Sequence, residues 1–349
     1  LAAPAAAPTG PHRILVVSSY HREYLWSQDT QKGLCAGLRE FHFLDQADQA
    51  AEFTRTDAVA SSSCLLKKIW MDTKRKDGKG QIAAAVDRVM KEVAAFGPDL
   101  VLLGDDNAAN YVGNQLVDTN IPVVFWGING LPLRYGLLDS LEEPGHNVTG
   151  VYQAGYLREC LEFLQRLLPK VKTFAVLSDD SETGRAKVKA LECLHAAGAL
   201  PLRLVESVVT NDLGVWQAGA LRLQDQVDAF FVMNHNSLKD NRGRPVDQLE
   251  VGRWYLRHIR KPECAHERQF AEEGLLCVCD DSGYNQGYEA VRRAHQILRE
   301  GRAPGRIAVT APGRGPFLVN RARARMLGLE ITPALGAEEI LETALALVD

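Results

Sequence analysis

The apolar run ILVV at 14–17 passes directly into Ser18, Ser19 and Tyr20, and this change decides the fold class. Short, unbroken apolar runs are typical of parallel strands that are buried on both faces of a sheet. In such sheets, ligands bind just beyond the carboxyl ends of the strands. The same change recurs in LVLL before GDDN (100–107), VVF before WGIN (123–129), FAVL before SDDS (174–181), AFFV before MNHN (229–236) and LLCV before CDDS (275–282).

Amphipathic segments of helical period separate these runs, which is the pattern of βαβ units. The turn-rich sequence PGHNVTG at 144–150 divides them into two sets and predicts two α/β lobes. Strands are expected at 13–17, 49–54, 99–103, 122–126, 172–177, 202–208, 229–232 and 274–282, with an extended stretch at 306–319. Helices are expected near 24–41, 79–95, 107–117, 156–168, 182–197, 213–225, 245–260, 284–300, 320–327 and 336–348.

The bulk composition is that of a globular protein with room for two cores. A chain of 349 residues exceeds the size at which a single core usually stops growing. The net charge of -4 gives no electrostatic reason to expect nucleic acid or an anionic membrane as partner. A dense basic stretch, with Lys67, Lys68 and residues 74–76, is interrupted by acidic residues, so we interpret it as a solvated face or loop.

The first ten residues, LAAPAAAPTG, resemble the segment around a signal-peptide cleavage site followed by a flexible tether. A trimmed chain is the alternative interpretation. No run reaches the roughly 18 apolar residues of a membrane-spanning helix. We therefore expect an exported, periplasmic protein, soluble or tethered near its N-terminus.

The seven cysteines are odd in number and lack metal-site spacing, so we expect them to be small core residues. Cys277 and Cys279 lie two apart on an expected strand, and we expect no bond between them. One disulfide from Cys264 to Cys277 or to Cys279 would be tolerated in an oxidising compartment, and the sequence does not assign it.

Enzyme signatures are largely missing from the sequence. It contains no dinucleotide or phosphate-binding glycine motif, no H-E-x-x-H and no G-x-S-x-G. His235 is the one histidine expected at a strand end, where it is either a ligand contact or a hydrogen-bonded loop residue. An enzyme that uses an aspartate and His235 as acid and base is the weaker hypothesis. We expect a binding protein without cofactor or metal.

Several segments resemble the substrate-binding components of ABC importers with the type I periplasmic binding protein fold. They are LEEPGHNVTGV (141–151), LPKVK (168–172), GLL (274–276), GYE (287–289), ILREG (297–301) and NRARARMLG (320–328). The resemblance implies two Rossmann-like lobes with parallel sheets, joined by a three-crossing hinge that closes over a ligand. We expect the tether at 1–11, the N-terminal lobe at 12–148 plus 281–312, and the C-terminal lobe at 149–280 plus 313–349.

The N-terminal lobe is similar to the sensing domains of some bacterial histidine kinases. The similar segments are SSYH (18–21) with Trp26, MDTKR (71–75), DDNA (105–108), and PVVF (122–125) with GIN (127–129). The resemblance therefore implies one of two membrane partners, an ABC permease or a sensor kinase.

The polar and aromatic residues at the strand ends are the candidate ligand-binding residues. Helix N-termini suit a ligand carboxylate, an aspartate suits an ammonium group, and aromatic rings can flank an apolar side chain. Trp126 is expected to be the strongest single contact. The candidates are Ser18, Ser19, Tyr20, Trp26, Asp105, Asp106, Asn107, Trp126, Asn129, Tyr152, Ser181, Thr183, Asn234, Asn236 and Asp280.

These observations predict a monomeric extracytoplasmic solute-binding protein that closes over a small polar metabolite for an ABC importer. An amino acid is expected, and the proteins that the chain resembles favour an aromatic one. The alternative is a receptor domain that senses a ligand and signals to a membrane histidine kinase.

Overall fold

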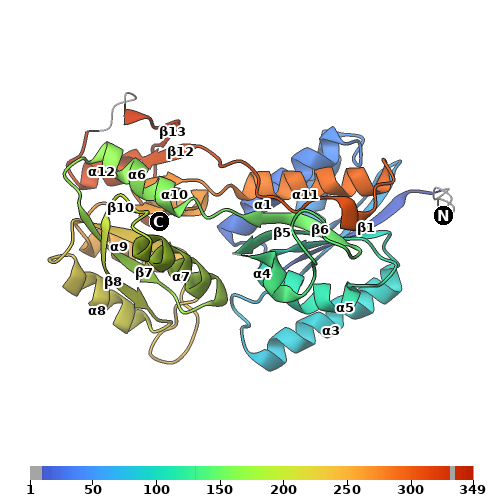
Figure 1. Ribbon diagram of the computed structural model, residues 1–349, viewed down its shortest axis with the longest axis horizontal. Helices are drawn as coiled ribbons and strands as arrows, with labels where there is room; N and C mark the ends of the chain where they lie inside the picture. The colour runs from blue at the N-terminus through green and yellow to red at the C-terminus, as the bar shows by residue number, and fades with distance from the viewer. Residues whose placement is uncertain (1–9, 130, 331–334, 349) are drawn as a thin grey trace. The chain divides into compact units, whose positions relative to one another are not determined.

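The computed structural model describes residues 10–129, 131–330 and 335–348 (Figure 1). It contains two compact units, which are Leu1–Gln153 with Gly283–Pro312 and Ala154–Ser282 with Gly313–Asp349. The chain therefore passes from one unit to the other three times. Each unit has one sheet of mainly parallel strands, which confirms the two-lobed α/β fold class.

The sheet of the first unit has the order β2-β3-β1-β4-β5-β6. All neighbouring strands are parallel except β2 and β3. The carboxyl ends of β1, β4 and β5 therefore meet at one edge of the sheet. The strands are β1 (His12–Ser18), β2 (Ala58–Ala60), β3 (Cys64–Trp70), β4 (Leu100–Gly104), β5 (Val123–Asn129) and β6 (Val148–Gln153).

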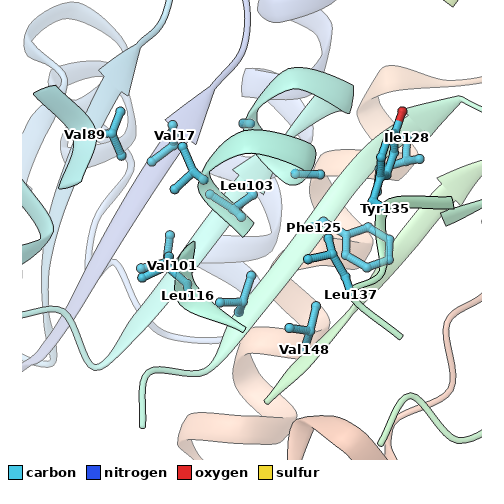
Figure 2. Packing of buried hydrophobic residues seen from close by; sticks show 14 of the residues in the cluster. Val17, Val89, Val101, Leu103, Leu116, Phe125, Ile128, Tyr135, Leu137 and Val148 are labelled. Carbon is cyan, nitrogen blue, oxygen red and sulfur yellow. The ribbon is translucent and has the colours of Figure 1, made fainter. Parts of the chain in front are cut away.

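Helices cover both faces of this sheet (Figure 1). On one face, α1 (Leu25–Glu40) and α11 (Gly283–Leu298) pack on β1, β4 and β5. On the other face lies α3 (Lys79–Phe96), together with α4 (Asp105–Asn107), a π-helical segment (Ala108–Gly113) and α5 (Asn114–Leu116). Figure 2 shows the core on this second face, where valine, leucine and phenylalanine side chains from the strands meet.

Glycines let α1 and α11 pack closely. A Cβ at Gly33 would lie 1.9 Å from the Tyr284 carbonyl oxygen, and one at Gly287 would lie 2.3 Å from that of Thr30. Backbone atoms cannot yield to such contacts, so both positions require glycine. This packing fixes α11, which directly follows residues 154–282 of the second unit in sequence, onto the sheet of the first.

The sheet of the second unit has the order β13-β12-β11-β10-β9-β7-β8, and β12 runs antiparallel to β11. The strands are β7 (Thr173–Ser178), β8 (Arg203–Val209), β9 (Ala229–Asn234), β10 (Glu263–Ala265), β11 (Cys277–Cys279), β12 (Phe317–Asn320) and β13 (Glu339–Leu341). The helices are α6 (Leu157–Leu167), α7 (Glu182–Ala196), α8 (Leu213–Leu223), α9 (Gln248–His258), α10 (Arg268–Glu273) and α12 (Arg321–Met326).

Two expected elements are wrong in type. The strand expected at 49–54 is part of helix α2 (Ala47–Thr56), which buries only Phe53 and begins with a capping box between Gln46 and Gln49. The helix expected at 336–348 is instead the strand β13, followed by a short 3₁₀ turn at Leu345–Leu347. In both places few residues are buried, so the hydrophobic pattern was too short to show its period.

Three strands of the first unit, β2, β3 and β6, were not expected from the sequence, and β3 contains Lys67 and Lys68 of the basic stretch that we interpreted as solvated. Its burial alternates, and the Lys68 side chain points into the protein with only 4% of its surface exposed. Lys67 points the other way and forms an ion pair with Glu92. The interpretation as a solvated face or loop was therefore wrong for Lys68 and also for Lys74, which is 7% exposed.

The divisions between the units follow Gln153, Ser282 and Pro312. The expected boundaries followed 148, 280 and 312, and the largest difference arises because β6 pairs with β5 in the first sheet. The expected tether at 1–11 lies mostly outside the described residues. The movement of the units as closing lobes stays a prediction.

All seven cysteines have free thiols, and five of them are buried. Cys264 and Cys277 are register partners on the adjacent strands β10 and β11. Cys160, Cys264, Cys277 and Cys279 belong to one apolar cluster of the second unit, as expected for small core residues.

Trp126 lies in the core of the first unit rather than at its polar edge. The side chain is fully buried among residues of β1, β4, α1 and α11, and its ring fills the space beside Gly104. A Cβ at Gly104 would lie 2.2 Å from this ring. The alternation of side chains along β5 thus directs Trp126 to the face that α1 and α11 cover.

We expect Trp126→Ala to destabilise the first unit by about 3–5 kcal/mol, because truncation of a buried tryptophan leaves a large cavity. Chemical denaturation followed by circular dichroism measures this loss. Trp254→Ala is the matched control, since Trp254 is only partly buried and should cost less. A Trp126→Ala protein of wild-type stability that fails to bind ligand would instead favour the original expectation of a ligand contact.

Candidate ligand-binding edges

Ser19 joins the ends of β1 and β4 at the polar edge of the first unit. Its hydroxyl donates to the Gly104 carbonyl at 2.6 Å and accepts from the backbone N–H of Ala108 at 2.8 Å. The Ser19 carbonyl in turn accepts from the hydroxyl of Thr73, which itself accepts from the Asn107 amide. Ser19, Thr73 and Asn107 therefore form one network across three loops.

Trp26 and Asp105 form the second element of this edge. The indole N–H of Trp26 donates to Asp105 Oδ1 at 2.7 Å, and both side chains are almost fully buried. Asp105 has a φ of +69°, in the left-handed region that aspartate and asparagine tolerate better than most residues. A Cβ at Gly127 would lie 2.5 Å from Asp105 Oδ1, so this glycine leaves room for the carboxylate.

Asp106 has a different role from its neighbour. Its carboxylate accepts from the Asn129 backbone N–H at 3.0 Å, the Asn129 amide at 2.7 Å and the Tyr135 hydroxyl at 2.8 Å. These bonds tie the β4–α4 turn to the end of β5. The pair Asp105–Asp106 is thus divided between two environments, and Asp106 positions Asn129.

Aromatic rings surround a buried cation at the same edge. Tyr20 and Tyr24 pack edge to face with centroids 5.2 Å apart, and together with Trp26 they form a small cluster. The Lys74 ammonium lies 4.8 Å from the Tyr20 ring centroid and 5.7 Å from that of Tyr24. This geometry is a cation–π contact.

In the second unit, Asp179 fixes the loop that precedes helix α7. Its carboxylate accepts from the Ser181 hydroxyl at 2.6 Å and from the Ser237 backbone N–H at 2.9 Å. Ser181 then caps the helix by accepting from Gly184 N–H at 3.0 Å. Thr183 lies in the first turn of this 15-residue helix, whose N-terminus favours negative charge.

Asparagine side chains lie at the end of β9, at the polar edge of the second unit. Asn234 is 2% exposed, and its side-chain Nδ2 finds no hydrogen-bond partner among the described residues. A buried donor of this kind costs free energy until it is paired. His235 points elsewhere, because its Nε2 contacts Glu273 at 2.8 Å and its ring packs beside Trp216 and Phe270.

A buried ion pair lies beside the ends of β10 and α7. Lys187 Nζ lies 2.9 Å from Glu267 Oε1, and His266 Nε2 lies 3.2 Å from the same oxygen. Burial and the nearby Lys187 lower the pKa of His266 to about 4, so this ring is neutral at pH 7. Burial alone would raise the pKa of Glu267, but Lys187 and His266 hold it well below its usual range.

The last carboxylate pair, Asp280–Asp281, follows β11 where the chain leaves the second unit. Asp280 accepts from the Arg268 backbone N–H at 2.8 Å, and its backbone bonds to Gly315 and Pro316. Asp281 accepts from the Gly155 N–H at 2.8 Å. Asp280 therefore ties segment 280–282 to segment 313–316, and Asp281 ties it to segment 154–155. Each of these three segments lies next to one of the three passages between the units.

Burial raises the pKa of Asp281 to about 6. The neighbouring Lys187 and the bond from Gly155 favour the ionised form, and they offset only part of the effect of burial. Asp281 is not among the candidate residues from the sequence, which include its neighbour Asp280. It lies one residue before the end of a segment of the second unit, and the strand pattern alone does not show where the chain passes between units.

The structure brings many of the candidate residues to the two polar edges. In the first unit these are Ser18, Ser19, Tyr20, Trp26, Asp105, Asp106, Asn107 and Asn129, and in the second Ser181, Thr183, Asn234, Asn236 and Asp280. It does not bring Trp126 there, and Tyr152 packs against the core on the α3 face. Whether these residues contact a ligand stays a prediction.

Sequence reasoning missed several buried polar residues at the same edges. Thr73 and Lys74 lie in the segment MDTKR, whose resemblance to sensing domains was the available signal. Lys187 follows Thr183 by one helical turn, which places it below the helix N-terminus. Glu267 and His266 follow β10, a strand too short to be detected from its pattern.

Comparison with known proteins identifies the class. The family model described as "ABC transporter substrate binding protein" matches residues 66–344. The chain belongs to this family, which consists of binding proteins and not of enzymes.

A curated relative, the "Tyrosine-binding protein" of Clostridioides difficile strain R20291, is 25% identical over 211 residues. The match covers 60% of this chain and 58% of the relative, so the chain spans less than two thirds of that protein.

Two solved structures share the fold. A conserved domain protein from Vibrio cholerae has a TM-score of 0.71 at 18% identity, covering 94% of this chain and 99% of that one. An ABC domain in complex with L-Trp from Streptococcus pneumonia has a TM-score of 0.70 at 20% identity, covering 95% and 100%. At these identities the likeness concerns the fold alone.

Membrane-spanning helices and clustered metal ligands are both absent from the described residues. No helix there is both long and apolar enough to cross a membrane. No group of three or more histidine, cysteine, aspartate or glutamate side chains in that part of the chain could hold a metal ion.

Asp281 should make stability depend on pH in a defined window. The pKa of Asp281 is about 6 in the folded protein and 3.8 in the unfolded chain. Between pH 3.8 and about 6 the folded protein therefore holds a proton on Asp281 that the unfolded chain has released. The stabilisation is complete below about pH 4 and is lost as the pH rises through 6. A shift of this size corresponds to on the order of 2–3 kcal/mol.

Asp281→Asn should remove this dependence while keeping an oxygen that accepts from Gly155. The measurement compares urea denaturation of both proteins from pH 4 to pH 7. The wild-type protein should lose stability relative to the variant as the pH rises, since all other groups are shared. Parallel stability curves for the two proteins would contradict the assignment.

Proposed function

We propose that this chain is an extracytoplasmic solute-binding protein that binds a small polar metabolite, an amino acid with aromatic ones favoured, and delivers it to an ABC permease. The match of the substrate-binding family model to residues 66–344 carries the proposal. The polar edge of each unit is a candidate contact surface for the ligand. Export to the periplasm follows from this role.

The proposed ligand class has support from names and from chemistry. One curated relative is named a tyrosine-binding protein, and one structural neighbour was solved with L-Trp. The first edge offers a carboxylate, Asp105, beside the aromatic residues Trp26, Tyr20 and Tyr24. A carboxylate suits an α-ammonium group, and aromatic rings suit an apolar side chain.

The second edge suits the other end of an amino acid. The N-terminus of α7, the buried Lys187 and the amide of Asn234 all favour or can donate to a ligand carboxylate. We therefore assign the ammonium group to the edge with Asp105 and the carboxylate to the edge with α7. Ser181, Thr183 and Asn236 are the supporting contacts in this proposal.

A sensing role is the second candidate. The segments that resemble histidine kinase sensing domains supply Ser19, Thr73 and Asn107, which form one network in the structure. The same ligand site would then report to a membrane kinase instead of a permease. Co-purification of the ligand-bound protein with the membrane proteins encoded beside it distinguishes the two partners.

Asp105→Asn should weaken the binding of tyrosine or tryptophan by about 1.5–3 kcal/mol, roughly tenfold to a hundredfold, because the charge-assisted bond to the ammonium group is lost. Asparagine keeps an acceptor for Trp26 and tolerates the left-handed backbone. Isothermal titration calorimetry with a panel of amino acids measures the affinity.

Two controls accompany this experiment. Asp87→Asn removes an exposed carboxylate on α3 and should leave the affinity unchanged. The propionate analogue of tyrosine, which lacks the ammonium group, should bind the wild-type and Asp105→Asn proteins equally. A folded wild-type protein that binds no amino acid would refute the proposed ligand class, and equal tyrosine affinity in both proteins would refute the role of Asp105.

A further inference from the structure

A groove lies between helices α1 and α2 of the first unit, apart from the polar edge described above. Its volume is about 630 Å³, within the range of small-molecule sites. Cys35, Ala50, Ala51 and Trp70 form apolar walls. Neither Trp26 nor Asp105 lines it, because Ser27 and Gln31 present a different side of α1.

The floor of the groove holds polar groups that are poorly satisfied. Ser27 is 3% exposed, and its hydroxyl has no hydrogen-bond partner among the described residues. The Gln31 amide Nε2 donates to Cys35 Sγ, a weak acceptor, at 3.4 Å and makes a long contact of 3.4 Å to Thr54 Oγ1. Both groups can donate to an acceptor atom of a molecule in the groove.

The charge around the groove is positive. Arg22, Lys32 and Arg55 line it together with the acidic residue Glu23. Arg22 forms an ion pair with Asp57, so Lys32 and Arg55 supply the excess positive charge. Behind the floor, the Lys68 ammonium donates to Gln31 Oε1 at 2.7 Å and lies 3.8 Å from the Trp70 ring centroid. The bond from Lys68 orients the Gln31 amide so that its N–H groups face away from the lysine.

We propose that this groove is a second binding site for a small molecule with a flat apolar body and one anionic group, such as an aromatic carboxylate. The apolar walls enclose the body, and Ser27 and Gln31 donate to the anion. Lys32 and Arg55 at the rim supply the attracting charge. Every residue of the site belongs to the first unit, so the proposal does not rest on the function proposed above.

Naphthoate and its cationic counterpart naphthylmethylammonium test the charge preference, because they share one ring system. Titration followed by the fluorescence of the tryptophans, including Trp70 at the groove, and by calorimetry measures binding to the full chain. Naphthoate should bind and the cation should bind at least tenfold more weakly. No binding of naphthoate, or equal binding of both probes, overturns the proposal.

Two variants test the position of the site. Ala51→Trp places a large side chain on the exposed wall of the groove and should abolish naphthoate binding. Ala47→Trp, one turn earlier on the same helix and outside the groove, should bind as the wild-type protein does. Unchanged naphthoate affinity in Ala51→Trp overturns the proposed position.

The double variant Lys32→Glu with Arg55→Glu changes only exposed side chains and tests the charge independently of packing. Reversal of two exposed charges should weaken naphthoate binding roughly tenfold. Unchanged affinity in this variant overturns the proposed role of the rim. Tyrosine or tryptophan affinity should stay at the wild-type level in all three variants, which separates this site from the polar edge.

Discussion

A carboxylate that is removed from water must be paired, and at Asp105 this requirement organises the polar edge of the first unit. The indole N–H of Trp26 meets Asp105 Oδ1, which links helix α1 to the turn after β4. Gly127 leaves the space that the carboxylate occupies, and Gly283 leaves space for the Trp26 ring. The close packing of α11 on α1, itself dependent on Gly33 and Gly287, then holds Trp26 in place.

Three strands are each followed by two consecutive aspartates, and the two carboxylates of each pair have different surroundings. In each pair, one carboxylate satisfies backbone or side-chain donors of a loop, as Asp106 does for Asn129 and Asp280 does for Arg268. Neighbouring residues beyond a strand point in different directions, so the second carboxylate meets other surroundings. In the last pair, that carboxylate is Asp281, whose raised pKa reflects burial without enough compensating donors.

Much of the fold could be predicted because the buried strands are continuous apolar runs. The six runs correspond to β1, β4, β5, β7, β9 and β11, and their polar ends lie where parallel pairing requires. Prediction failed where burial is partial, as in α2, which buries Phe53 alone, and in β3, where Lys68 interrupts the run. It also failed for Trp126, because a residue at the end of a run faces the core or the edge according to its register, which the sequence does not show.

Two of the three buried lysines in the described part of the chain, Lys187 and Lys68, illustrate two physical solutions to one problem. Lys187 forms an ion pair with Glu267, and this pair offsets the loss of hydration of both groups. Lys68 has an amide oxygen and an indole ring as its nearest partners, and burial lowers its pKa to about 7. A fixed charge pair suits a surface that must orient a charged ligand in the same way each time. A lysine near its titration point, held behind the Gln31 amide, is instead sensitive to the charge of whatever lies in the adjoining groove, because an anion there would favour its protonated form.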